Sequence, residues 1–251
     1  MPGRYLKSKN ISKVFGGVQA LQNVSFEVFQ GEILGLIGPN GAGKTTLFNC
    51  LTGIYAPTRG EIILEDSRRN LVGLKPAEVA KLGIARTFQN SRVFSGMTTL
   101  ENVMVGTFYG KEKPVGDRNQ VRRFSEEVLD RVGLGLKKNH RVSDLTLEDK
   151  KRLELGKALA TQPELLLLDE VMAGLNPTEI KEIVELLRRM RAGGVTLVIV
   201  EHVMHAVMSL ADRVCVLHHG EKIADGPPAE ISKDKRVIES YLGEEFLLAA
   251  S

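Results

Sequence analysis

The chain has little cysteine and little net charge, and each shortage excludes a class of protein. Only two of its 251 residues are cysteines, Cys50 and Cys215, and both lie inside apolar segments far apart in the sequence. We therefore expect buried free thiols in a reducing compartment and not a disulfide-stapled secreted fold. The net charge of +3 is too small to predict a nucleic-acid partner, since the 34 basic residues are dispersed. Basic clusters such as Arg122-Arg123 and Lys150-Lys151-Arg152 are expected to be solvated helix faces.

Long apolar runs are also missing. No stretch approaches the run of about 18 apolar residues that a membrane-spanning helix needs. Residues 1–5, MPGRY, lack the apolar core of a signal peptide, so we expect none. Any role at a membrane is therefore predicted to come through a partner protein. The hydrophobic content of 43% and charged content of 26% fit one or two ordinary globular domains.

The most specific feature that is present is a glycine-rich loop at residues 38–45, which read GPNGAGKT. It matches the phosphate-binding pattern G-x-x-x-x-G-K-[ST] at every fixed position, after an apolar run suited to a strand and before a helix start. Its glycines let backbone N–H groups converge on an anion, Lys44 can reach the β- and γ-phosphates, and the Thr45 hydroxyl can ligate Mg²⁺. The alternative, a turn with an incidental lysine, is disfavoured by the complete match. The candidate nucleotide contacts are Gly38, Pro39, Asn40, Gly41, Ala42, Gly43, Lys44, Thr45 and Thr46.

Two carboxylates follow an apolar segment later in the chain. Residues 165–168 are four leucines, and Asp169 and Glu170 come directly after them. A strand that ends in a carboxylate places Asp169 at the edge where open α/β sheets bind ligands, so it can hold Mg²⁺ through water. Glu170 can orient and polarise an attacking water. Two solvated acids at a strand end are the ordinary alternative, which the phosphate loop upstream disfavours.

Strand and helix patterns alternate along the chain and predict an α/β core that is interrupted by a helical insertion near residues 90–160. Asn176, Pro177 and Glu179 are typical of a helix start. We expect strands within 5–37 and at 60–64, 165–168 and 195–200, a hairpin of 214–217 with 221–224, a helix over 76–83, helical structure over 121–161 and an exposed loop over 107–120.

In this order, the motifs resemble those of the ATP-binding subunits of ABC transporters, over nearly the whole chain. Residues 87–89, TFQ, resemble the family's glutamine loop, and residues 173–176, AGLN, resemble a loop that meets its counterpart across a dimer. The resemblance implies that Phe15 and Val18 contact the adenine, that Gln89 joins Thr45 and Asp169 on Mg²⁺, and that Glu170 is the catalytic carboxylate. His202, which alone would more often be structural, then corresponds to the family's switch histidine.

The fold that the resemblance implies is an ABC-type P-loop ATPase with a RecA-like core, an antiparallel β subdomain and a helical subdomain. Residues 1–251 would form a single ATP-binding domain, with the helical subdomain at about 90–160. ATP and Mg²⁺ are the expected cofactors. The expected partners are a second ABC ATPase subunit, in a homodimer or heterodimer, transmembrane permease subunits and, indirectly, a periplasmic or extracellular solute-binding protein. The expected location is the cytoplasmic face of the membrane.

Four sequence segments resemble the subfamily of cassettes for branched-chain amino acid uptake: residues 85–89, 97–103, 173–177 and 241–244, the last near the C-terminus. That ending also resembles the ATPase of lipopolysaccharide export, which stays open as an alternative. Residues 88–103 are the expected docking surface for a permease. Phe94 and Met97 are its candidate apolar contacts, or else belong to the core of the helical subdomain.

One motif departs from the family pattern. The signature loop, Leu-Ser-Gly-Gly-Gln in the family, falls on Leu145, Thr146, Leu147, Glu148 and Asp149. Glycine lets backbone N–H groups approach the γ-phosphate held by the other subunit, and two acids oppose this, since unit charges about 6 Å apart repel by roughly 3 kcal/mol at a dielectric near 20. Thr146 and Asp149 also resemble a capping box at a helix start. The two acids can therefore cap the helix and also oppose contact with the phosphate. Val171, where proline is usual, is a milder departure. A slow nucleotide-dependent switch with weak hydrolysis is therefore a further alternative.

Overall fold

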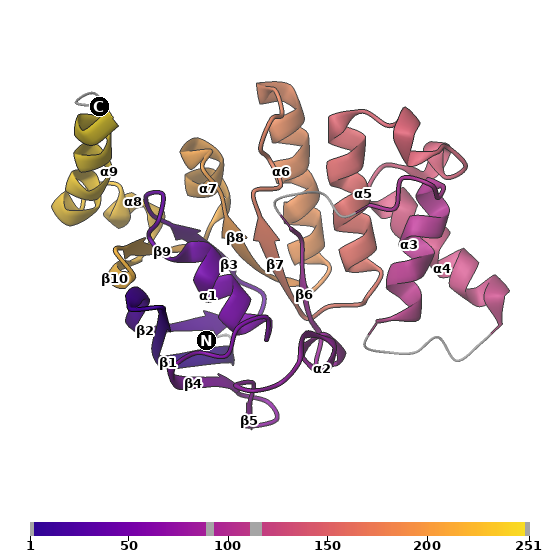
Figure 1. Cartoon of the computed structure of the whole chain (residues 1–251). Helices are drawn as coiled ribbons and strands as arrows, with labels where there is room; N and C mark the ends of the chain where they lie inside the picture. Colours follow the sequence, from indigo (N-terminus) through magenta and orange to yellow (C-terminus); the bar gives the residue numbers. More distant parts are fainter. Residues whose placement is uncertain (1–2, 89–92, 111–116, 249–251) are drawn as a thin grey trace. The chain divides into compact units, whose positions relative to one another are not determined.

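The computed structural model describes residues 3–88, 93–110 and 117–248, in two compact units (Figure 1). The first unit contains residues 1–76 and 196–251, and the second contains residues 77–195. Gln89, assigned above to the Mg²⁺ site, lies outside the described residues. Among the residues described, no helix combines the length and the apolar character needed to cross a bilayer.

An antiparallel sheet of order β2-β1-β4-β5 forms one part of the first unit. Apolar and polar residues alternate along β2, so that Val24, Phe26 and Val28 are buried while their neighbours are partly or fully exposed. Irregular register between the two long strands places Phe15 opposite Val18 at their tip. The strands are β1 (Arg4–Phe15), β2 (Val18–Phe29), β4 (Arg59–Leu64) and β5 (Arg69–Asn70).

The other part of the first unit is a mostly parallel sheet that carries the phosphate loop. β3 pairs in parallel with β8 on one side and β9 on the other, and β9 turns back antiparallel into β10. All five residues of β3 are buried, as expected for a central parallel strand. The elements are β3 (Ile33–Ile37), α1 (Lys44–Leu51), β8 (Thr196–Val200), α7 (Met204–Leu210), β9 (Arg213–His218), β10 (Glu221–Gly226), α8 (Pro228–Ile231) and α9 (Lys235–Leu248).

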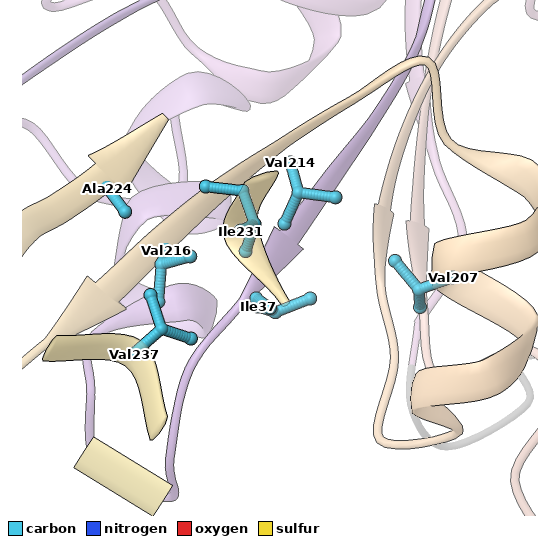
Figure 2. Close-up of a cluster of buried hydrophobic side chains, with 7 residues drawn as sticks. All are labelled: Ile37, Val207, Val214, Val216, Ala224, Ile231 and Val237. Atoms are coloured by element: carbon cyan, nitrogen blue, oxygen red, sulfur yellow. The ribbon is translucent and has the colours of Figure 1, made fainter. Parts of the chain in front are cut away.

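A buried apolar cluster fixes the strand that leads into this loop (Figure 2). The contact of α7 with β3 is close, because a Cβ atom on Gly35 would lie 2.7 Å from a methyl carbon of Val207. Burying each valine or isoleucine side chain stabilises the fold by about 1.5–3 kcal/mol. The cluster contains Ile37, Val207, Val214, Val216, Ala224, Ile231 and Val237.

The second unit contains a parallel strand pair and the helices that follow it. Ile84 pairs with Leu165 and Arg86 with Leu167, so the carboxyl ends of β6 and β7 lie side by side. The crossing of α3 and α5 is close, since a Cβ atom on Gly106 would lie 2.3 Å from the Lys157 carbonyl oxygen. The elements are α2 (Pro76–Lys81), which begins at the boundary, β6 (Ile84–Arg86), α3 (Thr99–Phe108), α4 (Arg118–Arg131), the 3₁₀ turns η1 (Gly135–Lys137) and η2 (Val142–Asp144), α5 (Leu147–Leu159), β7 (Leu165–Asp169) and α6 (Pro177–Ala192).

Most of the expected elements are confirmed, including the hairpin of β9 and β10 and the start of α6. Asn176 caps α6, with Pro177 in its first turn and Glu179 completing a capping box. The exposed loop expected over residues 107–120 is wrong in part, because Thr107 and Phe108 belong to α3 and α4 already begins at Arg118.

Both cysteines are buried and free, as expected. Burial raises the pKa of the Cys50 thiol to about 11 and that of the Cys215 thiol to about 12. Since the thiolate is the reactive form of cysteine, both side chains are inert packing residues at neutral pH.

Candidate nucleotide site

The phosphate loop needs glycine at two positions because of its close packing. A Cβ atom on Gly38 would lie 2.1 Å from the Leu217 carbonyl oxygen, and one on Gly43 would lie 2.7 Å from that of Ala20. Both residues have positive φ, 149° and 101°, which other residues adopt only with strain. Gly43 then caps α1, whose first residue is Lys44. The loop is thereby held against its own unit, with the N-terminus of α1 at its end.

Lys44 is folded into this loop. Its ammonium donates hydrogen bonds to the carbonyl oxygens of Gly38, at 2.6 Å, and Pro39, at 2.8 Å, and the side chain is buried. Thr45, next along α1, is exposed. A phosphate oxygen offers Lys44 a charged acceptor in place of a carbonyl, and charged acceptors form the stronger hydrogen bonds.

The end of β7 holds Asp169 in a buried ion pair. An oxygen of its carboxylate lies 2.7 Å from a guanidinium nitrogen of Arg86, and the two side chains are only 4% and 6% exposed. The Asp169 N–H donates to the Thr87 hydroxyl at 3.1 Å. Arg86 lies within residues 85–89, but its sequence pattern predicts no role for it in the site. The signal that could have found it is the position of both residues at the ends of neighbouring strands.

Glu170 has a strained backbone. Its φ is +53°, in the left-handed region that costs a residue with a side chain about 1 kcal/mol or more. The Lys151 ammonium donates to the Glu170 carbonyl oxygen at 2.9 Å, and Lys151 is only 5% exposed. The prediction that Lys151 lies on a solvated helix face is therefore wrong, because its charge is drawn inward by this carbonyl. The contact holds the turn that carries the Glu170 side chain.

The remaining expected contacts lie at the surface of the first unit. Phe15 is 39% exposed and Val18 is 69% exposed at the tip of the β1–β2 pair. His202 is exposed just after β8, and its carbonyl oxygen accepts from the Met204 N–H that begins α7.

In the second unit, Phe94 and Met97 are 44% and 37% exposed, so the alternative that they form a subdomain core is wrong.

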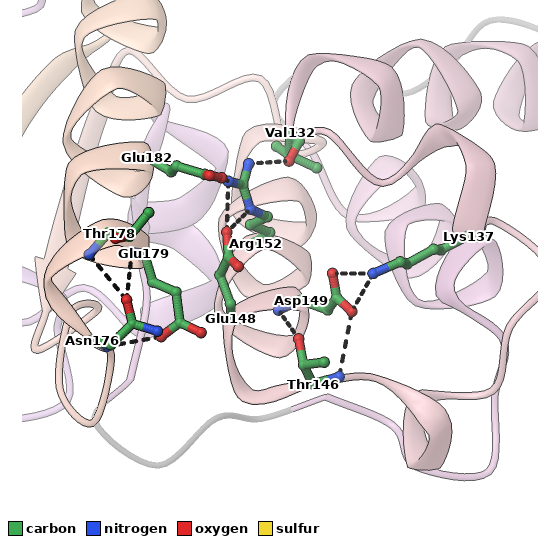
Figure 3. A network of polar contacts seen from close by, with 10 residues as sticks. All are labelled: Val132, Lys137, Thr146, Glu148, Asp149, Arg152, Asn176, Thr178, Glu179 and Glu182. Atoms are coloured by element: carbon green, nitrogen blue, oxygen red, sulfur yellow. Dashed lines mark hydrogen bonds and ion pairs between the residues drawn. The ribbon is translucent and has the colours of Figure 1, made fainter.

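Thr146 and Asp149 form the expected capping box at the start of α5 (Figure 3). Asp149 also accepts two hydrogen bonds from the Lys137 ammonium, at 2.6 and 2.8 Å. Burial acts to raise the pKa of Asp149, but the hydrogen bonds from Lys137 and Thr146 and the Lys137 charge outweigh it, so the pKa lies below its usual range. The charge of Asp149 is thus balanced within the chain.

Glu148 is likewise engaged by a neighbour. The Arg152 guanidinium donates to the Glu148 carboxylate at 2.7 Å and to the Val132 carbonyl at 3.2 Å, and it also pairs with Glu182 of α6 (Figure 3). The prediction that Arg152 lies on a solvated helix face is therefore wrong as well, because its guanidinium is held by these neighbours. Leu147, between these polar contacts, is 49% exposed.

The oxygen groups present fit an Mg²⁺ ion that arrives with a nucleotide. In the first unit Thr45 offers an exposed hydroxyl. In the second unit Asp169 offers a carboxylate, which is paired with Arg86. Mg²⁺ that is bound with a nucleotide takes few protein ligands and completes its shell with phosphate and water. Among the residues that the structure describes, no group of three or more His, Cys, Asp or Glu side chains could hold a metal alone.

A glycine loop that leads into a helix, and a buried strand that ends in two carboxylates, define the chain as an α/β P-loop nucleotide-binding protein. A model of the ABC transporter family matches residues 21–173, and a model of the branched-chain amino acid ATP-binding cassette transporter family matches residues 221–247. The chain belongs to the ABC transporter family, as one of its ATP-binding cassettes.

Two curated relatives illustrate the range of similarity. The high-affinity branched-chain amino acid transport ATP-binding protein LivG of Salmonella typhimurium is 45% identical over 242 residues, which cover 92% of this chain and 94% of that protein. The lipopolysaccharide export system ATP-binding protein LptB of Acidithiobacillus ferridurans is 33% identical over 241 residues, which cover 96% and 98%.

Solved cassettes share the fold. The ADP form of MJ1267, an ATP-binding cassette of an ABC transporter, has a TM-score of 0.87 at 30% identity, covering 96% of this chain and 99% of that one. The dimeric cassette MJ0796 bound to ADP and Pi has a TM-score of 0.79 at 26% identity, covering 89% and 98%. The expected ABC-type fold is thereby confirmed.

Proposed function

We propose that this chain is the ATP-binding and ATP-hydrolysing subunit of an ABC importer for branched-chain or related amino acids. The observation that carries the proposal is the 45% identity to LivG over 92% of the chain, with the phosphate loop intact within it. The match of residues 221–247 to the branched-chain cassette model supports the same solute class. LptB at 33% identity makes lipopolysaccharide export the weaker alternative.

The first unit supplies most nucleotide contacts in this proposal. Phe15 stacks on the adenine beside Val18, and residues 38–46 surround the phosphates. Lys44 exchanges its two carbonyl acceptors for the β- and γ-phosphate oxygens. Each charge-assisted hydrogen bond of this kind is worth about 1.5–3 kcal/mol.

Hydrolysis depends on the carboxylates of the second unit. Asp169, Thr45 and Gln89 would hold Mg²⁺, whose charge offsets that of the phosphates when it is bound. Glu170 accepts a proton from the attacking water, and the Lys151 contact holds its backbone in the turn observed. His202 stabilises the γ-phosphate and positions that water.

The proposed assembly contains a second ABC ATPase subunit and transmembrane permease subunits at the cytoplasmic face of the membrane. The dimer of the MJ0796 cassette supports the first partner. The exposed Phe94 and Met97 are candidate contacts for the second. A solute-binding protein would deliver the amino acid to the permease and would not touch this chain.

Replacing Lys44 by Ala tests the nucleotide-binding part of the proposal. The change removes the phosphate contacts of Lys44, whose gain is partly offset because they replace two carbonyl hydrogen bonds, so the affinity for Mg-ATP should fall by about 1.5–3 kcal/mol. Calorimetric titration of the isolated chain measures it, with Lys9→Ala as a control for an exposed lysine of the same unit. Equal affinity of Lys44→Ala and the unchanged chain would refute the assignment of Lys44.

Replacing Glu170 by Gln tests the catalytic part. The amide keeps the shape of the carboxylate but cannot accept the proton of water, so ATP should still bind while turnover stops. Steady-state phosphate release is measured with a competent partner cassette present, and Glu185→Gln, an exposed change on α6, is the control. Unchanged hydrolysis in Glu170→Gln would mean that another residue is the base.

A further inference from the structure

Phe15, Tyr55 and Lys13 form a group of three side chains that no sequence motif predicts. The Phe15 ring centroid lies 5.2 Å from that of Tyr55, and the ring planes are at 73°, an edge-to-face contact. The Lys13 ammonium lies over both rings, 4.9 Å from the Phe15 centroid and 5.7 Å from the Tyr55 centroid. A cation at these distances is attracted by the negative face of an aromatic ring.

Backbone contacts fix the segment that carries Tyr55 relative to β1. The N–H groups of Ile54 and Tyr55 both donate to the Asn49 carbonyl oxygen of α1, at 2.9 and 3.0 Å. Thr58 ties the following turn to β1, since its N–H donates to the Ser12 carbonyl oxygen. Its hydroxyl also accepts from the Val14 N–H. The helix of the phosphate loop and the strand of Phe15 therefore share one anchored segment.

Lys13 is anchored in turn, because its ammonium donates to the Ala56 carbonyl oxygen at 2.8 Å. Neither ring is part of the core, since Phe15 is 39% exposed and Tyr55 is 38% exposed. Holding Phe15, Tyr55 and Lys13 in one arrangement at the surface costs side-chain entropy. Binding energy from a ligand that contacts the ordered Phe15 ring would offset this cost.

We propose that Tyr55 and Lys13 are positioning residues for adenine: they hold the Phe15 ring so that one face carries the Lys13 ammonium and the other is presented to the base. The inference rests on the proposed function, in which Phe15 stacks on adenine. A base that meets an ordered ring loses less entropy on binding than one that must order it. Tyr55 lies in the turn after α1, which ends at Leu51, so the same segment sets the distance from the base-binding ring to the phosphate loop.

The test compares two ligands, Mg-ATP and Mg-tripolyphosphate, by calorimetric titration of the full chain. Both present a phosphate chain to the loop, but tripolyphosphate has no base. Replacing Tyr55 by Leu should weaken ATP binding by about two- to tenfold, the worth of an aromatic pair, and leave tripolyphosphate binding unchanged. Tyr55→Phe keeps the ring and should retain full ATP affinity. Tyr109→Leu, a change at a 76% exposed tyrosine of the second unit, is the matched control.

Lys13→Met provides an independent test, because it removes the ammonium group and keeps most of the length of the side chain. It should weaken ATP binding by about two- to fivefold, again without effect on tripolyphosphate. Unchanged ATP binding in Tyr55→Leu and Lys13→Met would overturn the inference. So would an equal loss for both ligands, which would mean that the group only supports the phosphate loop. If the unchanged chain binds neither ligand, the proposed function itself fails, and that result is distinct from either of these.

Discussion

At the scale of single residues, the buried pair of Arg86 and Asp169 is expected to have a large effect on stability. Two charges that are 6% and 4% exposed have lost most of their hydration, and the 2.7 Å contact between them offsets that loss. Removal of one partner leaves the other charge buried without compensation. Replacing Arg86 by Met should therefore lower the free energy of unfolding by about 3–5 kcal/mol, measured by urea denaturation.

The double variant Arg86→Met with Asp169→Leu separates this effect from a loss of packing. Buried ion pairs can often be replaced by apolar residues of similar volume without loss, so the double variant should be more stable than the single one. A double variant that is less stable than Arg86→Met would mean that the ion pair is not the source of the loss.

At this site the two carboxylates are predictable from the sequence, but the basic residues that contact them are not. Asp169 and Glu170 could be singled out because they end an apolar run, which is a local pattern. Arg86 contacts Asp169 across 83 positions and Lys151 contacts Glu170 across 19, so no local pattern links either pair. A basic cluster on a helix predicts a solvated face, but a backbone carbonyl and two carboxylates draw Lys151 and Arg152 inward.

At the scale of elements, the start of α5 depends on the cap that the sequence predicted. The Thr146 hydroxyl accepts from the Asp149 N–H at 3.1 Å. Thr146→Val keeps the shape of the side chain and removes this acceptor, so it should destabilise the chain by about 0.5–2 kcal/mol. Thermal or urea unfolding measures the loss, and Thr146→Ser, which retains the hydroxyl, should restore most of the stability.

The pH dependence of the same cap follows from Asp149. Its pKa is lowered in the folded state, so its contribution is fully present above the unfolded pKa of about 4 and is lost as the pH falls through the folded value. The stability difference between the unchanged chain and Asp149→Asn should therefore shrink in acid. A difference that stays constant from neutral pH to below the folded pKa would contradict the ionised capping box.

Elements with strong local signals were predictable, and those shaped by packing were not. Asn176, Pro177 and Glu179 predicted the start of α6 because a capping box is a contact within one turn. The loop expected over 107–120 begins too early, because Gly110, Pro114 and Gly116 among charged residues favour a loop while α3 runs on to Phe108. Inside α3, Gly106 allows the close crossing with α5, where a Cβ atom would lie 2.3 Å from the Lys157 carbonyl oxygen. This packing, which no local pattern shows, outweighs the low helix propensity of glycine.

At the scale of the whole molecule, the altered signature loop bears on how two copies of the chain would work together. The sequence suggested two obstacles to a partner's γ-phosphate, negative charge and the lack of glycine. Within the chain, Asp149 is paired with Lys137 and Glu148 with Arg152. Charges that are already paired repel a distant anion weakly, so the backbone remains the main obstacle.

We therefore predict that the homodimer is a poor ATPase and that glycine, more than neutralisation, restores it. Glu148→Gly with Asp149→Gln should raise turnover and ATP-dependent dimerisation together, because both depend on the approach of backbone N–H groups to phosphate. Glutamine at 149 keeps a capping side chain, so α5 should still begin at the same residue. Steady-state ATPase assays and light scattering on the isolated chain measure the two effects.

The matched control is Glu148→Gln with Asp149→Asn, which removes both charges and keeps the size of both side chains. It should gain little, since neither amide lets the backbone approach the anion more closely. A gain equal to that of the glycine variant would show that charge is the obstacle, despite the pairing with Arg152 and Lys137. Brisk hydrolysis by the unchanged homodimer, with no gain in either variant, would mean that capping is the whole role of the two acids. If the chain is instead slow alone but active beside a cassette with a glycine-rich loop, the difference is explained by the partner's loop, which would contact the ATP bound to this chain.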